Sequence, residues 1–371
     1  MRSAVVGAYN NELTRVAVDD SCNVYAIGYS SPDSLHFYFL IVKYNMSGNL
    51  MWHTTYYYDP GYKQDYATCF VLDTSRNVYV AGVSHTLAAG NIDNSLLKIN
   101  PNGVIQWASV YKGIGGNNQC GNIVPAMAVT PDGSAIYYTT FCGNGTGGGG
   151  YDIVTLKYNS LGDSDWVRRY GGGVGGTQNA PAALKLDRYF NIYVTGDVYN
   201  STSGDDYATI KYLPIGTQQW VATYNGPLTN SIDAANDLII DTSLNVYVTG
   251  FSSRQNIPVV LVDATTIKYN QPNGIQQVSN NIPKAFKLGS NYPNPFNPNT
   301  MFKFEIPKTE LIKIVIYDIL GREVAILMNE KLNPGVYEAN WNAGNYSSGV
   351  YFYQLIADGQ IIDTKKMILL K

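Results

Sequence analysis

The chain has 371 residues, of which 45% are hydrophobic and only 14% are charged, and its formal net charge is −3. This length and composition can fill several hydrophobic cores, and nothing in the chain resembles the basic stripe that nucleic-acid binding requires. The 31 tyrosines and 36 glycines favour strands and turns over helices, so we expect an all-β fold.

The N-terminus lacks the charged start, apolar middle and small-residue cleavage site of a signal peptide. No apolar run reaches the ~18 residues that span a bilayer as a helix. Residues 4–10, AVVGAYN, look like the last strand of a repeat, as at 220–225. This strand either closes the last repeat or follows further repeats and a signal peptide encoded upstream, and we favour the second.

Five units of about 55 residues follow one another from residue 12 to residue 280. Four of the five open with an Asp, three further residues, an Asn, an aliphatic residue and a Tyr, and the third, PDGSAIY at 131–137, shifts the Asp by one position and has no Asn. A Lys later ends an apolar run, and a Trp lies nine residues after that Lys in the first four units. The anchors are Asp19, Asp73, Asp132 (shifted by one position), Asp187 and Asp241; Lys43, Lys98, Lys157, Lys211 and Lys268; and Trp52, Trp107, Trp166 and Trp220, which Gln277 replaces in the fifth unit.

Each unit divides into four short strands separated by turn residues, such as ALKLD, NIYVTG, YATIKY and QQWVATY in the fourth unit. Four antiparallel strands repeated five times are the signature of β-propeller blades, which bury by radial stacking the faces that one blade would expose. We therefore predict a propeller of about five blades, or part of a larger ring, over residues 1–283. The units lie near 12–58, 66–112, 124–170, 181–225 and 235–280.

The repeated Asp can be interpreted in two ways. Rings of carboxylates could hold calcium, whereas an Asp at a tight hairpin accepts hydrogen bonds from the turn, and Asn tolerates positive φ. The copies lie on separate blades and lack the clustered ligands of a calcium loop, so we expect hairpin turns, with no metal and no cofactor. The repeated Lys and Trp are expected to pack within the blades, with the Lys stem over an aromatic ring.

Variation in spacing is confined to one end of each unit. The loops at 83–94, 113–124, 141–150 and 171–180 therefore gather on one face of the propeller. Loops on a rigid scaffold commonly carry binding residues, although Gly-rich loops can also simply tolerate insertions. Cys120 and Cys142 flank one strand pair and could form a disulfide in an oxidising compartment; unpaired cysteines in strands are the alternative.

The region after residue 283 follows a different pattern. The Pro/Asn-rich segment at 284–299 forbids helix and favours an extended chain, so we interpret it as a linker and the start of a second domain. Alternating apolar residues then predict about seven strands over 300–371, which is typical of a small immunoglobulin-like β-sandwich.

Two resemblances rest on these residues. The runs DYATIKY at 206–212 and NVYVTG at 245–250 resemble the SBBP-type β-propeller repeats of secreted bacterial proteins, a family that implies a fold but no catalytic residues. The region 284–371 is similar to the type A sorting domain of the type IX secretion system. The sorting-signal residues are Tyr292, Pro293, Asn294, Pro295, Phe296, Asn297 and Pro298; Gly349, Val350 and Tyr351; and Lys365, Lys366, Met367, Leu369, Leu370 and Lys371. An ordinary immunoglobulin-like module would explain the strands but not the terminal basic-aliphatic motif.

The second resemblance implies export to the extracellular space or the outer cell surface, with the type IX translocon and a sortase-like peptidase as partners. For the repeats we predict a non-catalytic module that binds a glycan or a surface protein through the variable loops. The alternative is a secreted carbohydrate-active hydrolase or lyase with its site at the channel mouth. Such an enzyme would have to use Asp residues, because Glu12 is the only Glu before residue 300 and His36, His53 and His85 form no evident catalytic set. A third hypothesis is that the active part of a longer protein lies upstream.

Overall fold

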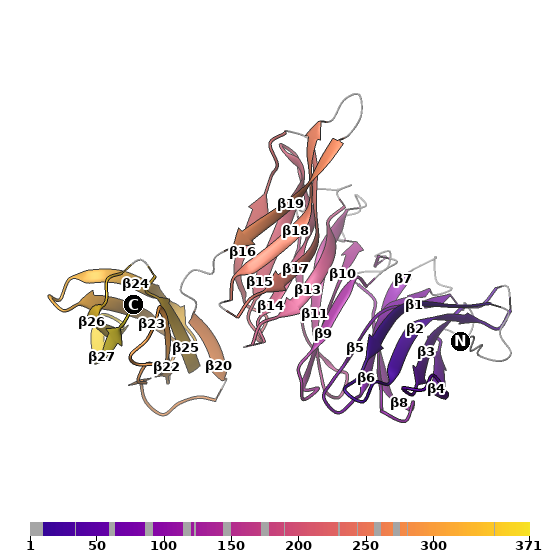
Figure 1. The fold of residues 1–371 in the computed structure, drawn as a ribbon, viewed down its shortest axis with the longest axis horizontal. Helices are drawn as coiled ribbons and strands as arrows, with labels where there is room; N and C mark the ends of the chain where they lie inside the picture. Colours follow the sequence, from indigo (N-terminus) through magenta and orange to yellow (C-terminus); the bar gives the residue numbers. More distant parts are fainter. Residues whose placement is uncertain are drawn as a thin grey trace. The chain divides into compact units, whose positions relative to one another are not determined.

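The computed structural model describes residues 10–33, 35–58, 64–85, 92–113, 120–121, 124–143, 150–171, 178–188, 190–228, 231–242, 244–255, 261–269, 275–279, 281–344 and 346–371. Within these residues every long regular element is a β-strand, β1 to β27 (Figure 1), so the prediction of an all-β protein is confirmed. The chain divides into two compact units, Met1–Tyr269 and Asn270–Lys371, which are called the repeat unit and the tail below.

The repeat unit is a series of antiparallel sheets in which each strand pairs with its neighbours in sequence. The first four sheets have four strands each: β1 (Asn10–Val18), β2 (Val24–Ser31), β3 (Tyr38–Tyr44) and β4 (Leu50–Tyr56); β5 (Asp65–Leu72), β6 (Val78–His85), β7 (Ile92–Ile99) and β8 (Ile105–Tyr111); β9 (Ala126–Val129), β10 (Ala135–Gly143), β11 (Tyr151–Asn159) and β12 (Ser164–Tyr170); β13 (Ala180–Leu186), β14 (Ile192–Asn200), β15 (Gly204–Tyr212) and β16 (Gln218–Tyr224). The fifth has three: β17 (Ser231–Ile240), β18 (Val246–Gln255) and β19 (Leu261–Tyr269). A short parallel pairing of β15 with β17 joins the last two sheets.

The repeated Asp closes the hairpin between the first two strands of a repeat. In the fourth repeat Asp187 accepts hydrogen bonds from Asn191 N at 3.0 Å, from Asn191 Nδ2 at 2.7 Å and from Tyr193 Oη at 3.0 Å. Equivalent bonds form at the anchor Asp of the first, second and fifth repeats. The residue with positive φ is the one before the Asn, with φ between 59° at Cys22 and 66° at Leu244. The sequence suggested positive φ at the Asn itself. Instead the Asn side-chain amide donates a hydrogen bond to the Asp carboxylate, and the residue before the Asn adopts the positive φ.

Successive sheets pack face to face. Tyr25 and Ile27 of the first sheet share a core with Val78 and Val80 of the second, and all four side chains are fully buried. The repeated Lys packs against this core, since Lys43 Nζ lies 4.9 Å from the centroid of the Tyr25 ring. Burial of this kind is the main stabilising term available to a stack of sheets.

The Trp of each of the first three repeats connects that repeat to the next one. Its indole Nε1 donates to a carbonyl in the third-to-fourth-strand turn of the following repeat: Trp52 to Pro101 at 2.9 Å, Trp107 to Ser160 at 3.0 Å and Trp166 to Pro214 at 3.1 Å. The ring lies over a glycine of that turn. A methyl group at Gly103, where φ is 84°, would lie 2.7 Å from the Trp52 ring.

Among the described residues the fifth sheet has no fourth strand, although the repeat pattern predicts one. In earlier repeats the Lys and Trp anchors face each other across the last two strands, as in Lys211 and Trp220. Gln277 holds the Trp position of the fifth repeat, but its strand β20 (Ile275–Ser279) pairs with β25 (Gly335–Asn342) of the tail. The unit predicted at 235–280 therefore ends with β19, and the boundary predicted at residue 283 lies between residues 269 and 270.

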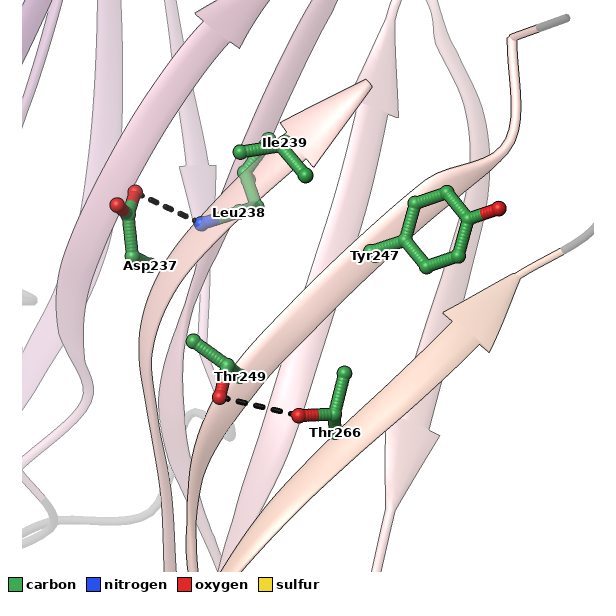
Figure 2. Close-up of a pocket in the computed structure, with 6 residues that line it drawn as sticks. All are labelled: Asp237, Leu238, Ile239, Tyr247, Thr249 and Thr266. Carbon is green, nitrogen blue, oxygen red and sulfur yellow. Dashed lines mark hydrogen bonds between the residues drawn. The ribbon is translucent and has the colours of Figure 1, made fainter. Parts of the chain in front are cut away.

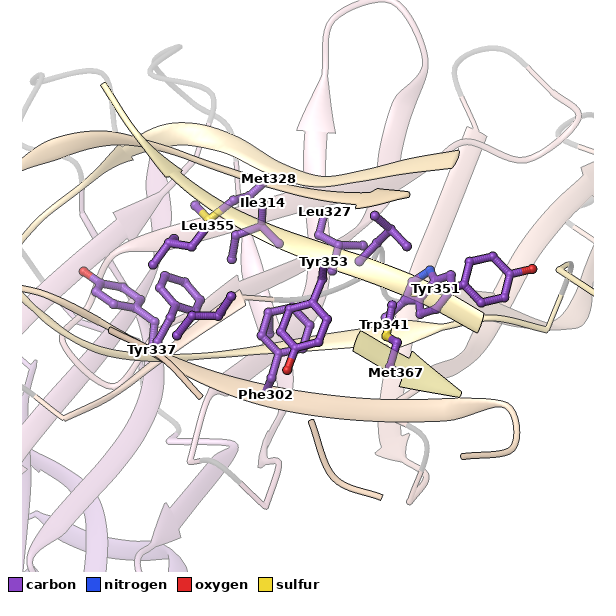
Figure 3. Close-up of a cluster of buried hydrophobic side chains, with 14 of the residues drawn as sticks. Phe302, Ile314, Leu327, Met328, Tyr337, Trp341, Tyr351, Tyr353, Leu355 and Met367 are labelled. Atoms are coloured by element: carbon purple, nitrogen blue, oxygen red, sulfur yellow. The ribbon is translucent and has the colours of Figure 1, made fainter. Parts of the chain in front are cut away.

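Two four-stranded sheets make up the tail, in the strand orders β20-β25-β22-β21 and β24-β23-β26-β27. The remaining bounds are β21 (Lys287–Leu288), β22 (Asn299–Ile306), β23 (Glu310–Asp318), β24 (Glu323–Leu332), β26 (Gly349–Ala357) and β27 (Gln360–Leu369). Side chains from both sheets, such as Phe302, Ile314 and Tyr353, form one hydrophobic core (Figure 3). The immunoglobulin-like class of this sandwich stays a prediction.

The Pro/Asn-rich segment, predicted as a linker and the start of the second domain, contributes side chains to the core of the tail. Leu288 and Phe296 are 3% and 2% exposed within the core of the tail. Tyr353 Oη donates a hydrogen bond to Gly289 O at 2.8 Å. The chain bends at 293–295 and at 297–298, so it is not extended throughout as the prolines predicted, although Phe296 still lies along the edge of a sheet.

Candidate functional site

Much of the variable loops lies outside the described residues, namely 86–91, 114–119, 122–123, 144–149 and 172–177, as do residues 4–9 of the strand predicted at 4–10. Aromatic side chains occupy the described bases of these loops. Phe37 lies 5.4 Å from both Tyr29 and Tyr66, centroid to centroid, and Phe141 forms an edge-to-face pair with Tyr151 at 5.4 Å. The loop end of the repeat unit thus presents rings at two places.

Carboxylates replace one of these ring pairs in the fourth repeat. The positions of Tyr29 and Phe37 correspond to Phe141 and Tyr151 in the third repeat and to Asp197 and Asp205 in the fourth. Asp197 faces Tyr207 across the strands, two residues from Asp205, so both carboxylates lie on one face of the sheet.

The two carboxyl groups resist ionisation. Burial, assisted by the charge of Asp205, raises the pKa of Asp197 to about 6. Burial also raises the pKa of Asp205, with the charges of Asp206 and Asp233 as further causes. Neighbouring carboxyls with raised pKa values can share a proton. Sequence analysis missed this pair, although an acidic residue where other repeats carry rings is a signal that an alignment of the repeats would reveal.

The structure joins Cys120 and Cys142 in a buried disulfide, with their Cα atoms 3.9 Å apart. The histidines are separate from one another. His36 Nδ1 lies 2.6 Å from Asp33 Oδ2, His85 Nδ1 lies 2.7 Å from Gln64 O, and His53 faces Val42 on β3. Among the described residues no group of three or more His, Cys, Asp or Glu residues could hold a metal ion.

An open cavity of about 140 Å³ lies on one face of the fifth sheet, lined by Asp237, Leu238, Ile239, Tyr247, Thr249 and Thr266 (Figure 2). The hydroxyls of Thr249 and Thr266 lie 3.2 Å apart. The fourth repeat has the same pair, Thr195 and Thr209, 3.1 Å apart and fully buried. The cavity therefore lies on the face that earlier repeats bury against the following sheet, and nothing about it indicates a ligand site.

The sorting-signal residues predicted from the sequence meet along strand β27 of the tail. Phe296 N donates to Ile368 O, and Leu370 N donates to Phe296 O, each at 2.9 Å. The Asn294 side chain accepts a bond from Ile368 N at 3.0 Å and donates one to Lys366 O at 3.4 Å. Residues 294–296 thus satisfy the backbone groups of β27 that would otherwise form a bare sheet edge.

Phe296, Tyr351 and Met367 of the signal pack inside the tail around Trp341, which the signal does not include. The Trp341 ring lies 5.6 Å from Phe296 and 5.2 Å from Tyr351, centroid to centroid. Figure 3 shows Trp341, Tyr351 and Met367 together at one end of the core. Trp341 and Met367 are fully buried, whereas Tyr292 is 77% and Leu370 54% exposed. The signal therefore divides into residues that build the fold and residues that solvent can reach.

Strand register brings the distant motifs to one end of the tail. Asp318 at the end of β23 faces Tyr351 on β26, and Tyr351 faces Met367 on β27. The C-terminal Lys371 donates from Nζ to Gly344 O at 2.6 Å and from its backbone N to Ser348 Oγ at 3.0 Å. This end, formed by the turn at 318–322, residues 343–344 and 346–348, and residues 369–371, is called the motif end below.

Residues 290–370 match the family described as secretion system C-terminal sorting domain. The chain therefore carries a sorting domain at its C-terminus, as its motifs predicted, and such a domain indicates export. The SBBP-type resemblance of the repeats stays a prediction. The part of the chain that the structure describes contains no helix that could span a membrane.

The comparison with curated proteins finds no match. Similar solved structures include the α-L-arabinanase of Penicillium chrysogenum, with 10% identity, 89% of this chain and 92% of that chain covered, and a TM-score of 0.45. A protein of unknown function from Dyadobacter fermentans has 9% identity, coverage of 88% and 92%, and a TM-score of 0.42. A thermostable family-43 glycoside hydrolase has 13% identity, coverage of 69% and 93%, and a TM-score of 0.34. At these identities and scores, neither a fold nor an activity is inferred from them.

Proposed function

We propose that this chain is delivered by the type IX secretion system to the outer cell surface or the extracellular space, where its repeat unit, as a propeller, binds a glycan or a surface protein without catalysing a reaction. The convergence of the sorting motifs at one end of the tail supports delivery. The translocon and a sortase-like peptidase are the partners that the sorting domain implies.

The binding half of the proposal rests on the asymmetry of the repeats. The ends closed by the repeated Asp and Trp are used for packing, whereas the opposite end carries the variable loops and the rings of Tyr29, Phe37 and Tyr66. Aromatic rings offer a large apolar face with little conformational entropy to lose, which suits recognition of sugars and proteins.

Export is tested in a bacterium that has the type IX machinery, by comparing the full chain with a chain that ends at Tyr269, each placed behind the same N-terminal signal peptide. We expect the full chain at the cell surface or in the medium and the shortened chain inside the cell envelope. Inactivating the translocon should retain the full chain as well. Equal export of both chains would sink the proposal.

Binding is tested with the purified full chain on glycan and extracellular-matrix arrays. Tyr66→Ala should lower the affinity for any captured ligand at least tenfold, because it removes one ring of the aromatic cluster. Met46→Ala is the matched control, since Met46 is 76% exposed and lies at the opposite, fixed-turn end of the first repeat. If both variants lose the same binding affinity, or if neither variant changes ligand capture, the loop end is not the binding surface.

The Asp197 and Asp205 pair favours a second candidate function, a carbohydrate-active hydrolase. Two carboxyls with raised pKa values could divide the roles of general acid and base. The purified chain would be incubated with a panel of polysaccharides, with Asp197→Asn and Asp205→Asn as controls. Release of reducing ends that both variants abolish would favour this function over simple binding.

A further inference from the structure

The hairpin turn between β23 and β24 lies at the motif end of the tail. Asp318 begins the turn and faces Tyr351, so the turn adjoins the strand that carries the Gly349, Val350 and Tyr351 motif. Tyr351 in turn faces Met367 of the C-terminal motif. The turn is therefore continuous with the region by which the tail is sorted.

This turn is built rigidly. The Asp318 carboxylate accepts hydrogen bonds from Leu320 N at 2.9 Å, from Arg322 N at 3.0 Å and from Arg322 Nε at 2.6 Å. Backbone bonds between Asp318 and Arg322 and from Gly321 N to Asp318 O close it further. Gly321 adopts a φ of 78°, a conformation that costs other residues energy.

The two residues at the tip of the turn are large aliphatics, whereas hairpin tips ordinarily carry polar residues. Ile319 is 69% exposed and Leu320 is 73% exposed, and Leu370 at the same end is 54% exposed. A fixed turn that holds adjacent apolar side chains in water gains nothing for the fold, but it lowers the entropic cost of inserting them into a partner.

We propose that the turn at 318–322 is a docking element, whose Ile319 and Leu320 side chains insert into an apolar pocket on a protein of the export machinery. This inference rests on the proposed export function. A protein pocket fits better than a lipid surface, because the apolar tip of the turn is only two side chains. The charged neighbours form ion pairs, Asp318 with Arg322 and Glu323 with Lys313, so they offer little net positive charge to anionic lipids.

The test uses the full chain, placed behind the same N-terminal signal peptide and expressed in a bacterium with the type IX machinery, and the readout is the exported fraction detected by antibody. Ile319→Ser combined with Leu320→Ser should reduce export at least tenfold. The matched control is Leu311→Ser combined with Ile361→Ser, which changes two residues that are 47% and 62% exposed at the opposite end of the same sheet. This control should be exported like the wild type.

Two further variants separate docking from folding. The purified double variant should melt at the wild-type temperature, because its side chains make few contacts; if it does not, Leu320→Gln, which keeps the size of the side chain, replaces it. Asp318→Ala should loosen the turn and reduce export less than the double variant does.

The outcomes are distinct. If removal of the tail leaves export unchanged, the proposed function itself fails. If removal of the tail abolishes export but the double variant is exported normally, or if both double variants are impaired equally, the docking element is overturned. Binding of the wild type, but not of the double variant, to vesicles of phosphatidylethanolamine and phosphatidylglycerol would replace the protein pocket by a membrane surface.

Discussion

The repeat unit and the tail bury the faces of their sheets in different ways. A sheet of the repeat unit relies on the next sheet, so its Tyr and Trp anchors face across a junction and recur at every junction. The tail folds two sheets onto a single core that contains its only Trp, Trp341. The repeat unit therefore distributes its stability over junctions, whereas the tail concentrates it in one place.

The two units also treat sheet edges differently. In the tail, residues 294–296 cover the edge of β27, and strand β20 covers the edge of β25. The fifth sheet of the repeat unit ends with β19, which pairs with β18 alone among the described strands. A domain that must pass through a translocon gains from covered edges, because bare edges invite pairing with other chains.

The largest expected effect is in the core of the tail. Trp341→Ala should destabilise the tail by ~3–5 kcal/mol, since it removes a fully buried ring. Calorimetry of the full chain should then show an early transition for the tail and an unchanged one for the repeat unit. Trp341→Phe is the milder control, because the indole Nε1 has no hydrogen-bond partner. A shift of both transitions would show that the units do not unfold separately.

Loss of the Cys120–Cys142 disulfide should affect only the repeat unit. The two cysteines are 22 residues apart in sequence, and a loop of this length corresponds to ~3 kcal/mol of stabilisation. Replacing both with Ser should lower the denaturant midpoint of the repeat unit and leave that of the tail unchanged. A reducing agent added to the wild type should reproduce the effect, and should do nothing to the variant.

Gly→Ala substitutions at two glycines of similar φ, one in each unit, should lower the free energy of unfolding by different amounts. Gly103→Ala should destabilise the repeat unit by ~2–3 kcal/mol, because strained backbone is combined with a collision against the Trp52 ring. Gly321→Ala in the tail meets nothing within 4 Å, so only the ~1 kcal/mol of backbone strain remains. Equal losses in urea unfolding would contradict the packing of Trp52 against the following repeat.

The smallest effect concerns pH. Because the pKa of Asp197 is raised from 3.8 to about 6 in the fold, its contribution to stability is complete below pH ~4 and is lost as the pH rises through 6. Asp197→Asn should therefore stabilise the repeat unit by ~1 kcal/mol at pH 8 and have no effect at pH 4. Tyr199→Phe serves as a control that leaves the carboxyl pair intact. A pH-independent effect would show that the shift is absent.

The repeat motifs and the sorting motifs show which features of this protein can be predicted from the sequence alone. The Asp, Asn and Tyr of four of the five repeats form hydrogen bonds over four to six residues, so their spacing alone predicts the hairpin. The motifs of the tail likewise predicted a sorting domain, because the match at 290–370 depends on residue identity and order. Local bonds and motif order are properties that a single chain displays directly.

Only the tertiary structure decided where the longer-range contacts fall. Strand β20 lies at the sequence position of the fourth strand of the fifth repeat, yet it pairs with β25. Every sheet edge offers the same backbone hydrogen bonds, so the packing of side chains determines which edge a strand joins. Asn294 forms a hydrogen bond with Ile368, 74 residues away in sequence, and this contact places residues 294–296 along the edge of β27. The Asp197 and Asp205 pair depended on strand register. Contacts of this kind arise from the way strands meet, which residue order alone does not fix.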